Sequence, residues 1–360
     1  MKLLILRNGA GIGGAEIYNL NLFKGFRRYY PEIELLFLTA NFNFYKLLKE
    51  IGARTVYLPV FNEEVGSKRG LLRFFLVFPR YLFSYMRQIL YLRFKEKIGH
   101  VFIQSLTEKI FLTPLLKILK FRVIWLEHGP VFTFKTSKIS LCLYSLVSNY
   151  VDRIVAVSID AQEDLFKNNI KKEKVGFIYT GVDTEYFRPQ KNQKKYYTIG
   201  YFGNLVKEKG IKDFINVGNL ILLKKKNVKF ILGGYGNLTI KNKSFFTLGF
   251  QKDIRPYLEN FSVYFFPTKH LEGLSLGILE AMAMGIPVVA RDIGGNCELV
   301  INNKTGILFK NETHEELAEI LINLLHDKKR REEMGRQARK LIVEKFNQKI
   351  WIDKIYRLFQ

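Results

Sequence analysis

The chain has 360 residues, 48% of them hydrophobic and 14% aromatic, which is enough to build the cores of two domains and excludes a disordered chain. Its formal net charge of +24 indicates an anionic substrate or surface as partner. The two cysteines, Cys142 and Cys297, lie far apart in sequence and form no metal-ligand pattern. We therefore expect a reducing compartment, no disulfide framework and no metal site.

The first residues, 1–6, predict a β-strand. A short apolar run with one lysine ends at Arg7 and a glycine-rich segment, which fits a strand better than a signal peptide. No run of about 18 uncharged apolar residues occurs, so we expect no transmembrane helix. These features lead us to expect a cytoplasmic protein.

Short apolar runs alternate with helical or irregular stretches in both halves of the chain, which predicts an α/β fold with parallel, doubly wound sheets. In the first half we expect strands at 2–6, 34–38, 55–58, 101–104, 122–126 and 153–157. In the second half we expect strands at 198–202, 229–232, 245–248, 263–266, 287–290 and 306–309, followed by helices at about 315–326, 328–345 and 348–358. Ligands of such folds bind beyond the carboxyl ends of the strands, so we expect a cleft between the two domains.

A glycine-rich loop follows the first strand, and two interpretations of it are open. Gly9, Gly11 and Gly14 satisfy the G-x-G-x-x-G fingerprint, which predicts an NAD(P)-dependent oxidoreductase. That fingerprint needs an acidic residue at the end of the second strand, where this chain has Leu38 and Thr39. We favour the other interpretation, a loop that lets the backbone approach the phosphates and sugar of a ligand.

The segment from Lys68 to Lys97 holds eight basic residues against one acid, Glu96, and is rich in aromatic residues. Proline is accepted at the first position of a helix, so we expect a helix at about 79–97 that begins at Pro79. Its polar stripe at helical spacing consists of Arg80, Ser84, Arg87, Gln88, Tyr91 and Lys95. Its remaining face consists of Leu82, Phe83, Met86, Ile89, Leu90 and Phe94.

This segment also has two interpretations. One is a helix that packs on a sheet with its polar stripe in water. The other is an anionic membrane surface as partner, to which each Lys or Arg near the surface contributes about 1 kcal/mol. The basic residues do not form a recognisable nucleic-acid module, so we expect no nucleic acid as partner.

His128 follows the expected strand at 122–126 and enters a turn made by Gly129 and Pro130. A lone histidine is more often structural than functional. Its place after a strand is nevertheless the expected one for a group that lines the cleft, so His128 is a candidate site residue.

Two glutamates, Glu272 and Glu280, flank a glycine turn and a helix expected at 275–284. The backbone amides of Gly273, Leu274 and Ser275 would have no intrahelical acceptor and would form a site for a pyrophosphate. Each carboxylate can bind a pair of neighbouring sugar hydroxyls. An ordinary buried αβ unit explains the apolar residues here, but not two acids that are costly to bury without partners.

The run from Glu272 through Glu280 to Val289 resembles the E-x7-E signature of the retaining glycosyltransferases with a GT-B fold, the "glycosyl transferases group 1" family, of the family 4 type. Four further segments also resemble that family: 13–16, 180–187, 203–210 and 294–306. The resemblance implies two Rossmann-like domains with a cleft between them. It places an acceptor-side domain at 1–190, a nucleotide-sugar domain at 191–345 and a helix at 346–360 that crosses back to the first domain. The polar run 190–195 marks the boundary.

The resemblance also implies the activity. It is transfer of a sugar from a nucleotide-diphosphate donor, with a UDP-sugar expected, to a hydroxyl of a glycan or lipid-linked acceptor, with retention at the anomeric carbon. Neither a cofactor nor a metal is expected, and the implied process is synthesis of cell-surface polysaccharide or lipopolysaccharide. The implied place is the cytoplasm, with peripheral association at the inner face of the cell membrane.

The resemblance assigns roles to individual residues. Lys209 and the amides at 273–275 would stabilise the leaving diphosphate, Glu280 would bind the ribose, and Glu272 would position the transferred sugar. His128 would orient that sugar or stabilise charge at its anomeric carbon, and would not act as a general base.

The glycines of the first loop, Gly13 and Gly14, would lie against the donor. One departure concerns Asn204, which stands where the family usually has an arginine. An amide donates hydrogen bonds without a charge, so a non-catalytic sugar-nucleotide-binding protein stays open as an alternative.

Overall fold

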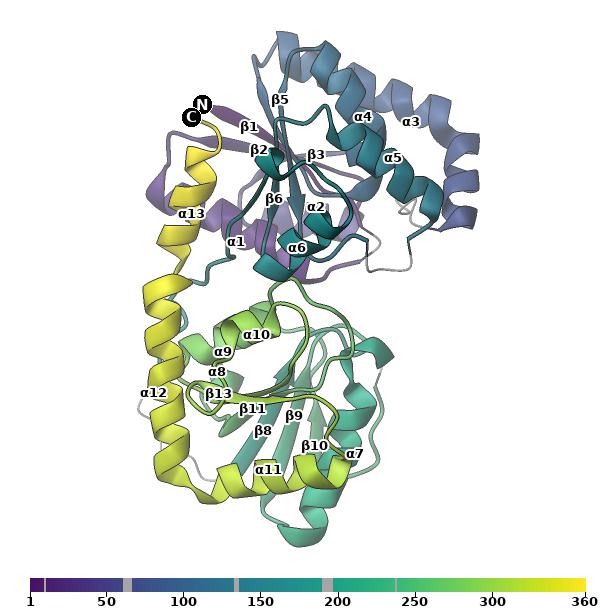
Figure 1. Ribbon diagram of the computed structural model, residues 1–360. Coiled ribbons are helices and arrows are strands. Elements are labelled where there is room, and N and C mark those ends of the chain that lie inside the picture. Colours follow the sequence, from purple (N-terminus) through teal and green to yellow (C-terminus); the bar gives the residue numbers. More distant parts are fainter. Residues whose placement is uncertain (10, 61–66, 133–135, 190–196, 237) are drawn as a thin grey trace. The chain divides into compact units, whose positions relative to one another are not determined.

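The computed structural model describes residues 1–9, 11–60, 67–132, 136–189, 197–236 and 238–360 (Figure 1). The chain divides into two compact units, the first made of Met1–Tyr179 and Ile352–Gln360, the second of Thr180–Trp351. Each unit holds one parallel sheet with helices packed on it. The α/β prediction of two Rossmann-like domains is confirmed. The polar run 190–195, predicted as the domain boundary, lies outside the described residues.

The first unit is built on seven parallel strands in the order β3-β2-β1-β4-β5-β6-β7. The strands are β1 (Lys2–Leu6), β2 (Glu34–Thr39), β3 (Arg54–Tyr57), β4 (His100–Ile103), β5 (Arg122–Glu127), β6 (Arg153–Ala156) and β7 (Val175–Phe177). All six predicted strands occur, within one residue at each end. The sequence pattern missed β7, because three residues are too few to show a periodicity.

Among the described residues ahead of the second unit there are six α-helices and one short 3-10 helix. They are α1 (Gly14–Tyr29), α2 (Phe42–Glu50), α3 (Lys68–Phe94), α4 (Leu106–Ile118), α5 (Lys138–Ser148), α6 (Ile159–Lys167) and η1 (Lys172–Lys174). The strand order reverses at β1, which has β2 on one side and β4 on the other. The carboxyl ends of β1, β4 and β5 are therefore adjacent, at the kind of switch point where doubly wound folds bind ligands.

Helix α3 corrects two predictions. It begins at Lys68, so Pro79 lies inside it and not at its start. A proline in a helix interior costs roughly 3 kcal/mol, but the helix also buries residues on both sides of Pro79, and each large apolar side chain contributes about 1.5–3 kcal/mol. The buried large hydrophobic side chains of α3 are Leu71, Phe74, Tyr81, Tyr85, Ile89 and Leu92.

The second correction concerns the face of α3 that packs on the protein. The expected apolar face included Phe83 and Phe94, but these rings are 64% and 67% exposed. Tyr81 and Tyr85 are buried instead, because their hydroxyls both donate to Glu108 Oε1, at 3.1 and 3.2 Å. In the part of the chain that the structure describes, no helix is long and apolar enough to cross a membrane.

The second unit is built on six parallel strands in the order β10-β9-β8-β11-β12-β13. The strands are β8 (Tyr197–Phe202), β9 (Val228–Gly233), β10 (Phe245–Thr247), β11 (Val263–Phe266), β12 (Val288–Arg291) and β13 (Gly306–Phe309). The helices are η2 (Lys207–Lys209), α7 (Ile211–Lys224), α8 (Arg255–Leu258), α9 (Leu276–Ala283), α10 (Asn296–Leu299), α11 (His314–His326) and α12 (Lys328–Lys345). All six strands predicted for this half are present.

The last helix, α13 (Gln348–Arg357), runs from the second unit into the first. Trp351 is buried in the second unit, where a side chain at Gly181 would come within 2.7 Å of its Cβ. From Ile352 onward the helix belongs to the first unit. There Tyr30 stacks on Tyr356 with ring centroids 4.1 Å apart, and its hydroxyl donates to Asp353 at 2.9 Å.

Candidate active site

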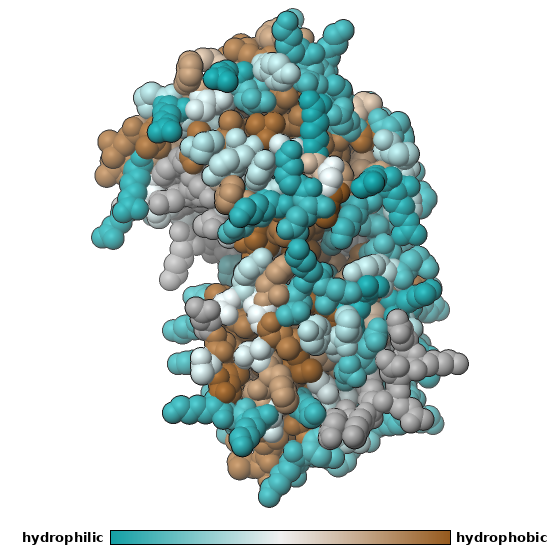
Figure 2. Space-filling model, turned by 180° about the vertical axis from the view of Figure 1, so that it is seen from behind, coloured by the Kyte–Doolittle hydropathy of each residue, from teal (hydrophilic) through white to brown (hydrophobic). Residues whose placement is uncertain are grey.

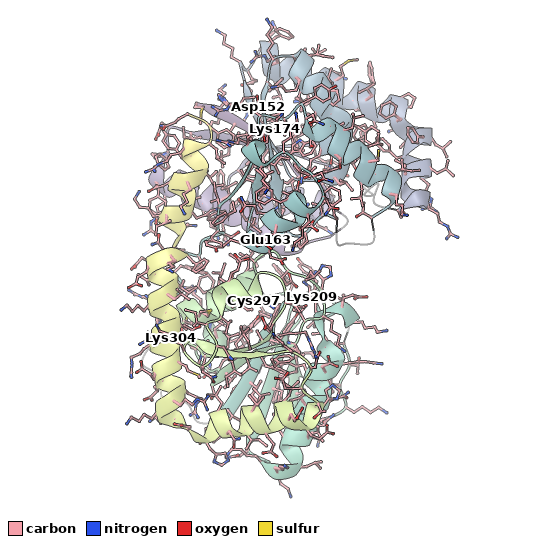
Figure 3. The ribbon with its side chains drawn as sticks, in the orientation of Figure 1. Asp152, Glu163, Lys174, Lys209, Cys297 and Lys304 are labelled. Atoms are coloured by element: carbon pink, nitrogen blue, oxygen red, sulfur yellow. The ribbon has the colours of Figure 1, made fainter. Side chains whose placement is uncertain are left out.

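Lys209 and Glu272 come together in the second unit. Lys209 ends η2, close to the N-terminal end of α7 (Figure 3), and Glu272 lies between β11 and α9. The Lys209 ammonium forms an ion pair with Glu272 Oε1, and both side chains are less than one-fifth exposed. Thr268 Oγ1 donates to the same carboxylate oxygen at 3.4 Å. Two residues that the sequence placed in separate loops therefore share one site.

The turn before α9 presents free backbone amides. Ser275 caps the helix, and its hydroxyl accepts from the Ile278 amide at 3.5 Å. No described residue accepts a hydrogen bond from the amides of Gly273, Leu274 or Ser275. Free amides at the N-terminus of a helix make a site for an anion.

A second glycine turn, 294–295, packs against the turn at 273–275 and hydrogen-bonds to it. The Gly295 amide donates to the Glu272 carbonyl at 2.9 Å. A Cβ atom on Gly295 would lie 1.6 Å from the Gly273 carbonyl oxygen, so only glycine permits this approach. The two turns together fix the backbone that carries Glu272.

Glu280 is a half-buried carboxyl on α9, and no described residue donates a hydrogen bond to it. Loss of solvation raises its pKa to about 8. The group is therefore largely protonated at neutral pH, and its oxygens are available to a ligand.

Tyr264 is a buried polar residue near Glu272 and Glu280 that the sequence did not predict. It lies on β11, and burial together with the charges of Glu280 and Glu272 raises its pKa. Its hydroxyl donates to the Phe202 carbonyl at 2.7 Å and accepts from the Phe202 amide at 3.1 Å. The signal that could have found it is a lone phenol in a strand that is otherwise apolar.

We expect the pKa of Glu280 to make stability depend on pH. Between about pH 4.5 and 8 the folded protein keeps a proton that the unfolded chain releases, so its stability falls as pH rises through that range. Glu280→Gln should remove this loss and stabilise the protein at pH 8.5 by roughly 2 kcal/mol, a value discounted for the solvent that the side chain still contacts. Urea unfolding of both proteins at pH 5 and 8.5 measures the change in the free energy of unfolding. An equal difference between the variant and the unmodified protein at both pH values would contradict the raised pKa of Glu280.

Asn204 lies half-buried in the loop after β8, and its side-chain amide makes no hydrogen bond to a described residue. The Tyr201 hydroxyl donates to the backbone carbonyl of Asn204 at 3.2 Å. The amide of the neighbouring Leu205 donates to the Tyr235 carbonyl at 2.7 Å. The backbone is therefore fixed while the amide group stays available.

In the first unit, His128 stands at the carboxyl end of β5 and is half-buried. Its Nε2 lies 3.0 Å from Gln104 Oε1. The Tyr18 ring packs edge-on against the imidazole, with ring centroids 4.9 Å apart. Burial and the charges of Arg7 and Lys109 hold the pKa of His128 well below its ordinary value. The imidazole is neutral at physiological pH.

A buried ion pair supports the strand end that carries His128. Lys109 Nζ lies 2.6 Å from Glu127 Oε1 and donates to the Leu126 carbonyl at 2.6 Å. The Tyr144 hydroxyl also donates to Glu127 Oε1, at 2.8 Å. The sequence signal that could have found this pair is Lys109, a basic residue within an apolar helix pattern. That pattern does not identify Glu127 as the partner of Lys109.

The glycine-rich loop of the first unit is held by polar side chains. Gly13 caps α1, and its amide donates to Glu16 Oε2 at 2.8 Å. Asn41 Nδ2 donates to the carbonyls of Gly9 and Gly11, at 2.9 and 2.8 Å. A Cβ atom on Gly14 would meet nothing within 4 Å, so protein packing alone does not require glycine there.

Sequence profiles of known families agree with this architecture. The profile "Glycosyltransferase Family 4" matches residues 12–186, and the profile "Glycosyl transferases group 1" matches residues 182–341. The chain belongs to the glycosyl transferases group 1 family. The chain has no carboxylate at the end of β2, where Thr39 stands, so the oxidoreductase alternative has no support.

Relatives of the chain include the capsular polysaccharide biosynthesis glycosyltransferase CapM of Staphylococcus aureus, 29% identical over 57% of this chain and 61% of CapM. Poly(ribitol-phosphate) α-N-acetylglucosaminyltransferase of the same species is 29% identical over 45% of this chain and 35% of its own length. The chain thus aligns with less than two thirds of either relative. HepE of Anabaena, solved with UDP and glucose, has a similar fold, with a TM-score of 0.82, 19% identity and coverage of 100% and 99% of the two chains.

Proposed function

We propose that the protein is a retaining glycosyltransferase that moves a sugar from a UDP-sugar to a hydroxyl of a glycan or lipid-linked acceptor in cell-surface polysaccharide synthesis. The observation that carries this proposal is the turn before α9, where three free amides lie between Glu272 and the unpaired Glu280. The name of CapM supports the process, and the complex of HepE with UDP and glucose supports the donor.

The proposed chemistry is electrostatic. The bond between the anomeric carbon and the diphosphate oxygen breaks, its electron pair goes to the diphosphate, and the acceptor oxygen bonds to the same face of the sugar while its proton passes to the leaving phosphate. Lys209 and the amides at 273–275 stabilise the charge that develops on the diphosphate. Independence from metal is part of this proposal.

Donor binding would redistribute the contacts of the site. Lys209 forms an ion pair with Glu272. In the proposed complex Lys209 turns to the diphosphate and Glu272 to the hydroxyls of the sugar, while Glu280 binds the ribose. Asn204 adds an uncharged donor where the family usually has a cation.

Thermal stabilisation tests the donor site. A ligand present at about 100 times its Kd stabilises the folded state by about 2.7 kcal/mol, so we expect UDP-sugars to raise Tm and Glu280→Ala to abolish the rise. NAD and NADP are the negative controls, and GDP- and ADP-sugars test the base. Stabilisation without sugar transfer would indicate the non-catalytic binding protein instead, and no stabilisation by any nucleotide sugar would refute the site.

We also propose that α3 rests on an anionic membrane. Its outward apolar residues include Leu72, Leu76 and Phe83, which are 68%, 80% and 64% exposed. The exposed basic residues beside them are Arg69, Arg73, Arg80, Arg87 and Lys95. Figure 2 shows hydrophobic side chains at the surface around α3, next to long hydrophilic ones. An apolar row flanked by arginines is typical of a helix that lies in a membrane interface, and such a surface would bring a lipid-linked acceptor to the enzyme.

Vesicle sedimentation tests this surface. We expect binding to vesicles of phosphatidylglycerol and phosphatidylcholine but not to phosphatidylcholine alone, and a loss of roughly tenfold in Leu76→Ser/Phe83→Ser. Leu223→Ser is the matched control, because Leu223 is equally exposed, at 80%, but lies on α7 of the other unit. Equal binding by both variants would refute a specific role for α3.

A further inference from the structure

A chain of hydrogen bonds connects α1 to Gln104 at the end of β4 and to His128 at the end of β5. Asn19 Nδ2 donates to the Ala15 carbonyl at 2.8 Å and to Gln104 Oε1 at 2.7 Å. Gln104 Nε2 donates back to Asn19 Oδ1 at 2.8 Å. His128 Nε2 lies 3.0 Å from the same Gln104 oxygen. Asn19 and Gln104 are both buried, at 0% and 4% exposure.

The polarity of this chain is fixed at one end by the backbone. A carbonyl can only accept, so the nitrogen of the Asn19 amide faces Ala15. The same nitrogen also donates to the Gln104 side chain. The Gln104 atom that faces it must therefore be the amide oxygen, Oε1. Gln104 Oε1 can only accept as well, so His128 Nε2 must carry the proton.

The imidazole is therefore held as the Nε2–H tautomer. Its Nδ1 keeps a lone pair, and no described residue hydrogen-bonds to it. The edge-on ring of Tyr18, at 4.9 Å and 86°, restricts rotation of the imidazole. In this state His128 can accept one hydrogen bond at Nδ1 but cannot donate one there.

We propose that Asn19 and Gln104 are positioning residues that hold His128 so that its Nδ1 accepts a hydrogen bond from a hydroxyl of the substrate. The inference rests on the sugar transfer proposed above and specifies the partner of His128. An Nδ1 lone pair selects a hydroxyl, which can donate, over a diphosphate oxygen, which cannot. His128 therefore recognises the sugar or acceptor part of the reactants and not the diphosphate.

Long-range ¹H–¹⁵N NMR of the imidazoles tests the tautomer directly. The chain has five histidines, and a His128→Asn variant identifies the signal of His128. We expect Nε2 to carry the proton and the signal to stay unchanged from about pH 8 to pH 5.5. A proton on Nδ1, or titration near the ordinary pKa of histidine, would overturn the inference.

Gln104→Glu tests the positioning role. A carboxylate beside Nε2 favours the imidazolium, so His128 should titrate within the measured pH range, and Nδ1 should then lose its lone pair at low pH. We expect sugar transfer by this variant to fall at least tenfold below the new pKa and to recover above it. Gln337→Glu, the same change at a half-buried position on α12 of the second unit, should leave the pH profile unchanged.

The outcomes separate the two proposals. An unchanged pH profile in Gln104→Glu, in spite of a titrating His128, would overturn the positioning role. Absence of transfer by the unmodified protein, with the Nε2–H tautomer present, would instead overturn the proposed function.

Discussion

Replacing Glu272 or Lys209 with alanine is expected to lower kcat/KM for sugar transfer by roughly two to three orders of magnitude, the cost of removing one group that stabilises developing charge. In the proposed complex each residue contacts the donor: Lys209 the diphosphate and Glu272 the sugar. The loss should appear mainly in kcat for Lys209→Ala, because its contact with the leaving group strengthens in the transition state. Initial rates over a range of donor concentration measure both constants.

The matched controls lie in the same loop. Lys207→Ala and Glu208→Ala remove neighbouring exposed charges and should retain activity within about threefold, since exposed ion pairs and charges contribute little. Circular dichroism confirms that each variant is folded. Near-native activity in both Lys209→Ala and Glu272→Ala would refute the assignment of the site.

Replacing Lys109 with methionine is expected to destabilise the first unit by about 3–5 kcal/mol, because it leaves the Glu127 carboxylate buried without a counter-charge. Burial already raises the pKa of Glu127 in spite of its bonds to Lys109 and Tyr144. Urea unfolding, followed by the near-UV signal of Trp125 on β5, measures the transition of this unit.

Lys117→Met is the control for this variant. It lies on the same helix, α4, and pairs with Asp152 at 2.8 Å, but both side chains are about one-third exposed. Loss of this exposed ion pair should lower the free energy of unfolding by less than about 1 kcal/mol. Adding Glu127→Gln to Lys109→Met should recover part of the lost stability. Equal effects of the two lysine variants would contradict the role of the buried pair.

Much of the candidate site was predictable because its groups belong to local patterns. The turn at 273–275, the cap at Ser275 and the end of α9 after Ala283 follow from glycine positions and helical spacing. These signals depend on residues a few positions apart, which the sequence displays directly. The partners of His128 and Lys209 were not predictable in this way, because Gln104 and Glu272 lie far from them along the chain.

Helix α3 shows why a local rule can fail. Pro79 is a valid helix start when only its neighbours are considered. In the folded unit, Leu71 and Phe74 are buried ahead of it, and the free energy of burying them offsets the cost of an internal proline. The exposed rings of Phe83 and Phe94 follow from the same packing, because Tyr81 and Tyr85 reach the buried Glu108.

The sequence by itself determined the two parallel α/β units and the loops that carry the candidate site, because strand and helix periodicity and glycine turns are local properties of the chain. The tertiary structure alone decided which groups meet within each unit: the ion pair of Lys209 with Glu272 beside the amides at 273–275 in the second unit, and the contact of His128 with Gln104 in the first. The physical reason is that hydrogen-bond polarity, desolvation and packing depend on distances between residues remote in sequence, and these distances exist only once the sheets are assembled.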